Sequence, residues 1–177
     1  MAPTLILIGF MGSGKTAVGN YLARGLGWDF FDADPMVEEQ AGASIAEIFK
    51  QEGEAAFRRA EEGVVLGLLD EADVSSEGTV VSLGGGAVTI PAVAERLRCE
   101  PLVFLLDEDV NRAYARARRS SRPLARDADE FRRLYAQREK LYLELARYVV
   151  DTKENDVKTV ADEIVMVLRR LGVAGIA

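Results

Sequence analysis

The chain contains no histidine, and this absence removes a large class of chemistry. Imidazole acid–base catalysis and the commonest zinc ligand are both excluded. A single cysteine, Cys99, excludes a disulfide within the chain and any metal site built from several cysteines. We interpret Cys99 as an ordinary core or loop thiol. Catalysis in this protein must therefore use carboxylates, cations, backbone dipoles or a bound metal.

Long apolar runs and a basic leader are also lacking. The opening residues, MAPTLILIGF, hold an apolar run too short for a signal peptide or a membrane span, so we expect no membrane partner and a cytoplasmic location. The net charge of −7 repels nucleic acid, and we expect no nucleic-acid partner. Arginines nevertheless crowd one segment: Arg112, Arg116, Arg118, Arg119, Arg122 and Arg126. We interpret most of them as part of a solvated helix face and a charged loop. The alternative interpretation is that this local positive charge binds a small anion.

A chain of 177 residues that is 49% apolar fits one globular domain, residues 1–177. Short apolar runs alternate with segments of helical periodicity, and Ser44 with Glu47 forms a capping-box pattern. Pro123 predicts a mobile loop over 120–129. We predict an α/β fold, a three-layer α/β/α sandwich with a five-stranded mostly parallel sheet, whose ligands bind beyond the carboxyl ends of the strands. The expected strands are 4–8, 28–31, 79–83, 101–106 and 148–151, and the expected helices are 15–26, 35–42, 44–51, 54–70, 91–97, 108–119, 130–146 and 157–171.

The stretch GFMGSGKT, residues 9–16, matches the phosphate-binding pattern G-x-x-x-x-G-K-[ST] and lies between a predicted strand and a predicted helix. That context disfavours a chance glycine turn. In this motif backbone N–H groups and the helix N-terminus bind phosphates, the lysine reaches the β and γ oxygens, and the hydroxyl ligates Mg²⁺. We therefore predict an ATP site with Mg²⁺, built from Gly12, Ser13, Gly14, Lys15, Thr16 and Ala17.

Two aspartates, Asp32 and Asp34, follow the second predicted strand in the sequence FFDADP. Residues two apart on a strand point the same way, so both carboxylates can face the cleft. One would orient metal-bound water and the other would accept the proton of an alcohol nucleophile. An Asx turn with a helix N-cap suits the same residues, but we favour the chemical reading because the pair lies beside a phosphate cradle.

Three consecutive glycines, residues 84–86, end the next predicted strand in SLGGGA. A strand-to-helix turn needs one or two glycines, and each additional glycine loses conformational entropy on folding. The run therefore predicts that a ligand lies directly against the main chain, where side chains would occupy its volume.

The motifs GFMGSGKT, DAD, FRR, SLGGGA and RPL occur in this order over nearly the whole chain, which closely resembles the shikimate kinase family. The resemblance implies ATP-dependent phosphorylation of the shikimate 3-hydroxyl in aromatic amino-acid biosynthesis, with Mg²⁺ as cofactor. It also implies a P-loop NTPase fold of the nucleoside monophosphate kinase type, with substrate-binding helices at about 33–61 and a lid at about 112–128. We expect a monomer.

The resemblance assigns roles to individual residues. Asp34 would hydrogen-bond the shikimate hydroxyls and act as the base, while Asp32 would lie near Mg²⁺ with Thr16. Arg58 and Arg138 would grip the substrate carboxylate. The floor beneath the ring would be formed by Gly84, Gly85 and Gly86, and Arg122 would be the lid arginine that, with Lys15, meets the transferring phosphate.

Two positions depart from the family pattern. An arginine that lies against adenine aligns with Ala115 here, with Arg112 or Arg116 as a substitute after a shift, and Lys153, Glu154 and Asn155 stand where relatives carry another arginine. The competing functions are another small-metabolite kinase, such as gluconate kinase or a nucleoside monophosphate kinase, and a non-catalytic nucleotide-binding module.

Overall fold

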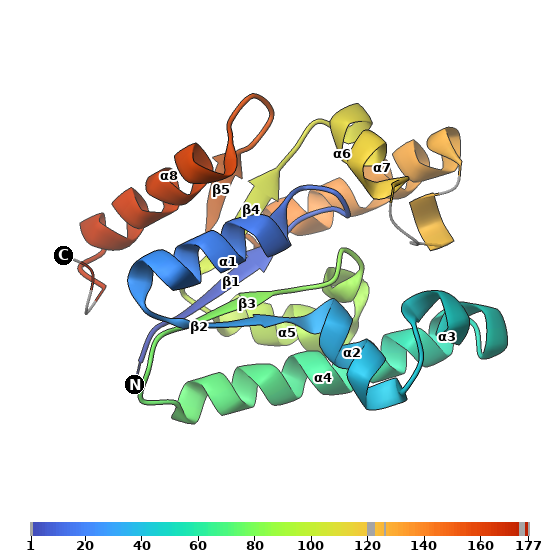
Figure 1. Ribbon diagram of the computed structural model, residues 1–177, viewed down its shortest axis with the longest axis horizontal. Helices are drawn as coiled ribbons and strands as arrows, with labels where there is room; N and C mark the ends of the chain where they lie inside the picture. Colours follow the sequence, from blue (N-terminus) through green and yellow to red (C-terminus); the bar gives the residue numbers. More distant parts are fainter. Residues whose placement is uncertain (1, 120–122, 126, 174–175, 177) are drawn as a thin grey trace.

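The computed structural model describes residues 2–119, 123–125, 127–173 and 176, and these form the elements drawn in Figure 1. The strands are β1 (Thr4–Ile8), β2 (Asp29–Asp32), β3 (Thr79–Ser82), β4 (Val103–Asp107) and β5 (Tyr148–Asp151). The α-helices are α1 (Lys15–Leu26), α2 (Ala33–Ala41), α3 (Ile45–Gln51), α4 (Glu54–Val74), α5 (Pro91–Cys99), α6 (Val110–Ala117), α7 (Ala128–Leu145) and α8 (Val157–Arg170). Two 3₁₀ turns, η1 (Ala87–Thr89) and η2 (Pro123–Ala125), join them.

The sheet has the strand order β2-β3-β1-β4-β5, and every pairing between neighbours is parallel. Leu5 and Ile6 of the central strand are both fully buried, which explains its continuous apolar run, because a parallel sheet is covered on both faces. The carboxyl ends of all five strands meet at one edge, on the right in Figure 1 and away from both chain termini.

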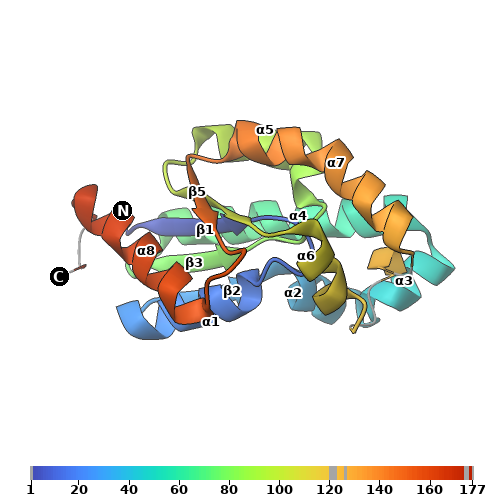
Figure 2. The same ribbon diagram turned by 90° about the horizontal axis from the view of Figure 1, so that it is seen from above.

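Helices cover both faces of the sheet, which confirms the predicted three-layer sandwich. Helices α1 and α8 pack on one face, where Val18 and Ile164 meet Leu5 and Leu7. Helices α4, α5 and α7 pack on the other face against Ile6 and its neighbours, and Figure 2 shows the two layers on opposite sides of the strands.

Aspartate caps explain where several predicted helix bounds were wrong. Helix α2 begins at Ala33 rather than 35, because the Asp32 side chain accepts a hydrogen bond from the Asp34 N–H. Asp109 caps α6, which is shorter than predicted. Asp127 caps α7, which begins at Ala128, two residues before its predicted start at 130. The capping box of Ser44 with Glu47 is confirmed at α3, while α4 continues beyond residue 70.

Part of the predicted loop over 120–129 is helical, since η2 and the start of α7 fall within it. Residues 120–122 and 126, and with them Arg122 and Arg126, lie outside the described residues. Of the helices that the structure describes, none combines the length and apolar character needed to cross a membrane.

Candidate active site

The phosphate-binding loop between β1 and α1 depends on backbone that only glycine adopts easily. Gly9, Gly12 and Gly14 have φ of 146°, 85° and 95°, a region that side chains disfavour. Gly14 is the N-cap of α1, so the free N–H groups of the first helical turn begin at the loop. The Lys15 side chain is only 6% exposed, and its ammonium donates to the carbonyls of Gly9 at 2.7 Å and Phe10 at 3.1 Å.

A cavity opens over this loop and brings together most of the predicted nucleotide residues. Its lining includes Gly12, Gly14, Lys15, Thr16 and Ala17, together with both aspartates of the DAD sequence. Ser13 is buried and is not among the residues that line the cavity. Its N–H donates to the Phe10 carbonyl at 3.2 Å within the loop.

Thr16 and Asp32 supply two adjacent oxygen ligands of the kind that Mg²⁺ prefers. The Thr16 hydroxyl donates to Asp32 Oδ2 at 2.5 Å. Burial raises the pKa of Asp32, against the opposing effect of the Thr16 hydrogen bond. The described residues contain no cluster of three or more histidine, cysteine or acidic side chains that could hold a metal. Because Mg²⁺ is commonly bound by one or two protein oxygens plus substrate phosphates and water, the pair fits this ion.

Asp34 reaches the cleft by a different route from the one predicted. It lies in the first turn of α2, one residue past Ala33, rather than at the end of a strand, and its N–H donates to Asp32 Oδ1 at 3.3 Å. The N-cap interpretation is therefore correct for Asp32, and both aspartates line the phosphate cavity, while their chemical role stays a prediction. Asp34 lines the phosphate cavity and also a second cavity beside it.

This second cavity, the acceptor cavity, is lined by both charged and apolar residues. Its charged and glycine lining consists of Asp34, Arg58, Glu61, Gly85, Gly86 and Arg138, and its apolar lining of Met11, Ile45, Phe49, Phe57 and Leu124. Such a mixture suits a small ligand whose polar groups are fixed in direction and whose carbon skeleton is covered.

Arg58 is held in place by two carboxylates of its own helix. Its guanidinium pairs with Glu54 Oε1 at 2.9 Å and with Glu61 Oε2 at 2.5 Å, and it lies 5.1 Å from the centre of the Phe57 ring. Burial opposes the charge of Arg58, but the two carboxylates outweigh it and raise its pKa. Most of its positive charge is thus balanced before any ligand binds.

Glu61 is a buried acid that sequence reasoning missed. It is 1% exposed, and burial raises its pKa against the opposing effect of Arg58. Its Oε1 atom has no hydrogen-bond partner among the described residues. The spacing of three residues from Arg58 on one helix is the signal that could have revealed it.

Arg138 differs from Arg58 in lacking a carboxylate partner. It is 6% exposed, and no ion pair between described residues includes it. Its Nη1 donates to the Gly85 carbonyl at 3.3 Å, and burial lowers the pKa of its guanidinium, with Arg58 acting in the same direction. A buried cation of this kind makes the acceptor cavity attractive to an anion.

The three glycines are required by protein groups that surround them. A Cβ at Gly84 would lie 2.1 Å from Glu61 Oε1 and 2.7 Å from Asp34 Oδ1, and one at Gly85 would lie 2.9 Å from the Met11 nitrogen. A Cβ at Gly86 would lie 2.2 Å from Arg58 Nη1. None of these three residues has a positive φ. Close approach of protein atoms is thus a second reason for glycine at these positions. Gly85 and Gly86 also line the acceptor cavity, and a ligand against their main chain stays a prediction.

The comparisons with known proteins agree with this geometry. Residues 11–169 match the family model described as shikimate kinase. A shikimate kinase from Mycobacterium avium is 41% identical over 168 residues, which cover 93% of this chain and 93% of the relative. The chain belongs to the shikimate kinase family. A solved structure of a shikimate kinase from Acinetobacter baumannii in complex with shikimate is 33% identical, covers 97% of this chain and 95% of its own, and has a TM-score of 0.88.

A structure of a gluconokinase from Sinorhizobium meliloti has a TM-score of 0.55 and 17% identity over 96% of this chain and 93% of its own. That likeness extends to the fold alone. The shikimate kinase family is therefore favoured over the alternative small-metabolite kinase.

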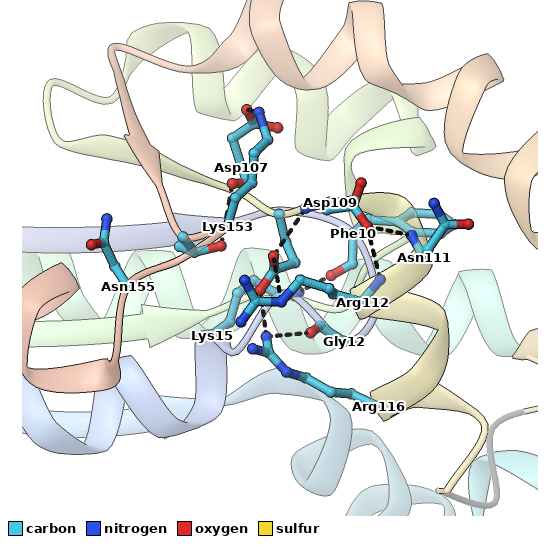
Figure 3. A network of polar contacts seen from close by, with 12 residues as sticks. Phe10, Gly12, Lys15, Asp107, Asp109, Asn111, Arg112, Arg116, Lys153 and Asn155 are labelled. Atoms are coloured by element: carbon cyan, nitrogen blue, oxygen red, sulfur yellow. Dashed lines mark hydrogen bonds and ion pairs between the residues drawn. The ribbon is translucent and has the colours of Figure 1, made fainter.

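Of the two arginines expected to replace the missing adenine arginine, Arg116 reaches the phosphate loop (Figure 3). Its Nη1 donates to the Gly12 carbonyl at 3.3 Å and to Glu108 Oε2 at 2.6 Å. Arg112 lies farther from this carboxylate, with its Nε 3.9 Å from Glu108 Oε1. Glu108 is buried, so α6 is attached to the loop through a fixed ion pair.

Two of the residues that stand in place of the second family arginine bind neighbouring groups of the protein. Lys153 forms an ion pair with Asp107 at 2.7 Å, and the Asn155 amide donates to the Asp151 carbonyl at 2.9 Å. Figure 3 shows Lys153 and Asn155 on the strand side of the site, apart from Arg116. The predicted lid arginine, Arg122, lies outside the described residues.

Proposed function

We propose that this chain transfers the γ-phosphoryl group of ATP to the 3-hydroxyl of shikimate, giving shikimate 3-phosphate and ADP. One observation carries the proposal: Asp34 lines both the phosphate cavity and the acceptor cavity, so a single carboxylate faces the two substrates. Membership of the shikimate kinase family supports the choice of substrate.

Shikimate carries one carboxylate and three hydroxyls on a small ring, and the acceptor cavity offers a partner for each kind of group. Arg138 is a buried cation with no ion pair among the described residues, and it would bind the carboxylate with Arg58 beside it. Planar guanidinium groups match a carboxylate in geometry. Asp34 would accept hydrogen bonds from the hydroxyls, and Gly84, Gly85 and Gly86 would form the floor.

The chemical step requires a base and stabilisation of negative charge. Asp34 would take the proton of the shikimate 3-hydroxyl, and the oxygen of that hydroxyl would attack the γ-phosphorus of ATP in line with the bond to the leaving ADP. Lys15, at the phosphate loop, would neutralise charge on the transferring group, and the family resemblance gives Arg122 the same role. Bound Mg²⁺, with Thr16 and Asp32 as its protein ligands, would neutralise phosphate charge. Positioning and electrostatics supply most of the rate acceleration in such reactions.

Arg116 would contact the nucleotide, because it lines the phosphate cavity and touches the loop at Gly12. We further propose a cytoplasmic monomer, since the reaction consumes ATP and the sequence has no heptad pattern. Light scattering after gel filtration, with and without ADP, measures the oligomeric state.

The test is a coupled assay that measures ADP release with shikimate, gluconate or AMP as the acceptor. ADP release that depends on shikimate alone, with shikimate 3-phosphate identified by mass spectrometry, is the expected result. The Asp34→Asn variant should retain ADP binding by calorimetry and lose turnover. ADP release with gluconate or AMP as the acceptor would show that the chain is a different kinase. ADP binding without turnover of any acceptor would show that it is a non-catalytic nucleotide-binding module.

A further inference from the structure

Tyr142 is a buried tyrosine behind the lining of the acceptor cavity, and the reaction chemistry gives it no role. It lies on α7 one helical turn after Arg138, and 2% of it is exposed. Its hydroxyl donates a hydrogen bond to the Gly85 carbonyl. The same carbonyl accepts from Arg138 Nη1 at 3.3 Å. Two side chains of one helix therefore hold one peptide group of the glycine run.

We propose that Tyr142 is a positioning residue for the acceptor site: it anchors the Gly85 peptide and leaves the Arg138 guanidinium available to the substrate carboxylate. This inference rests on the proposed function, because it takes the acceptor cavity as the shikimate site.

The glycine run needs such an anchor. Three consecutive residues without side chains have the widest choice of backbone conformations, so a defined floor requires external contacts. On one side the Gly85 backbone lies close to the Met11 nitrogen, and on another Tyr142 holds its carbonyl. In a trans peptide the carbonyl and the following N–H point in opposite directions, and the described residues contain no cis peptide. Fixing the Gly85 carbonyl therefore fixes the direction of the Gly86 N–H as well.

The second part of the role concerns how two donors share one acceptor. The Gly85 carbonyl is buried, and a buried carbonyl that lacks a donor is costly. With Tyr142 as a donor, the contact of Arg138 with this carbonyl is a long one through a single nitrogen, and the Tyr142 hydroxyl also interacts with the Arg138 guanidinium. Without the hydroxyl, Arg138 would be the stronger partner of the carbonyl and would be drawn away from the ligand.

The hydroxyl is suited to this permanent role. Burial raises the pKa of Tyr142, with the cation of Arg138 opposing that shift, so the phenol remains a neutral donor at physiological pH. Tyr135, one helical turn before Glu139 on α7, provides a contrast, because its hydroxyl donates to Glu139 at 3.4 Å, whereas the Tyr142 hydroxyl donates to the Gly85 carbonyl.

The test compares Tyr142→Phe with Tyr135→Phe, each of which removes one hydroxyl and keeps the ring. For Tyr142→Phe we expect the KM and Kd for shikimate to rise roughly three- to tenfold, the effect of one neutral hydrogen bond. The kcat should change less than twofold, and the Kd for ADP should not change. Tyr135→Phe should match the parent protein in all four quantities.

Several outcomes would overturn the proposal. An unchanged shikimate affinity with a lower melting temperature would assign Tyr142 a structural role only, and an equal loss of shikimate and ADP affinity would show a general disturbance. If Tyr142→Phe is too unstable alone, shikimate titrations at saturating ADP provide the same comparison, since a ligand of the other cavity stabilises the fold. A parent protein that does not bind or phosphorylate shikimate would instead refute the proposed function.

Discussion

The two cavities of this site are built in different ways. The phosphate cavity takes nearly half of its lining from one continuous stretch, the loop and first turn that contain Gly12 to Ala17. The rest of its lining comes from Asp32, Asp34, Ser82, Leu83, Arg116 and Ala117. The acceptor cavity takes its lining from the loop, α2, α3, α4, the glycine run, η2 and α7. The centre of the first cavity is thus one local motif that other segments complete, whereas the acceptor cavity has no such motif and exists only when distant segments have packed together.

This difference follows from what each ligand needs. A polyphosphate needs positive potential and several N–H donors, which a glycine loop and a helix N-terminus supply by themselves. A small carboxylated ring needs discrete charges at fixed distances, and these must be brought from several elements. Damage to the first cavity should reduce turnover, and damage to the second should reduce selectivity and acceptor affinity.

The largest expected effect is that of Lys15→Met in the phosphate cavity. Removal of one preorganised donor typically raises a barrier by roughly 3 to 4 kcal/mol, so kcat should fall about a hundredfold to a thousandfold. Steady-state kinetics measures the fall and circular dichroism checks the fold. Lys140→Met, at an exposed position on α7, is the matched control and should retain full activity. Comparable activity in the two variants would contradict the role of Lys15.

The corresponding change in the acceptor cavity is Arg58→Ala. A hydrogen bond to a charged group contributes roughly 1.5 to 3 kcal/mol, so shikimate affinity should fall about ten- to a hundredfold while ADP affinity stays constant. Calorimetry with each ligand separates the two. A loss of ADP affinity with unchanged shikimate affinity would show that Arg58 serves the nucleotide and not the acceptor.

The same substitution should make stability depend on pH. Glu61 already has a raised pKa in the folded protein, and without Arg58 that pKa should rise further, because the cation opposes the effect of burial. A carboxyl with a raised folded pKa stabilises the fold at low pH and loses that contribution as pH rises through the folded value. Relative to the parent, Arg58→Ala should therefore melt earlier at pH 8 than at pH 5. Arg58→Ala with Glu61→Gln should lose this difference, and persistence of the difference would argue against Glu61 as its source.

The smallest effect distinguishes glycines of the acceptor floor from glycines of a helix. Gly67 is exposed on α4, and a Cβ there meets nothing within 4 Å, so Gly67→Ala should stabilise the protein by about 0.5 to 1 kcal/mol and leave activity unchanged. Gly86→Ala, whose Cβ would overlap the Arg58 guanidinium, should raise the KM for shikimate. Equal KM values for the two variants would show that the floor tolerates side chains.

Much of the fold could be predicted because its signals are local. The βα alternation predicts the sandwich, and the bounds of β1 and α1 agree with their predicted ranges. The strand order is not a local property, because it depends on which strands pair across the sheet. The errors at α2, α6 and α7 have one physical cause, namely aspartates that start a helix earlier or later than the apolar pattern suggests.

The site shows the same division. Lys15, Thr16 and Asp32 are readable from the motif and its flanks. Glu61 and Tyr142 are not, because a glutamate or tyrosine on a helix is unremarkable until the fold buries it against an arginine or a carbonyl. Each lies one helical turn from a predicted arginine, which is a weak signal when taken alone.

Because Asp34 lines both cavities, we expect that the two substrates do not bind independently of each other. We expect any change that shikimate makes to the orientation of this carboxylate to alter the free energy with which ATP binds. Thermodynamic linkage requires that ATP alter the binding of shikimate by the same factor. A measured cooperativity between the two ligands would thus report on one side chain at their shared wall.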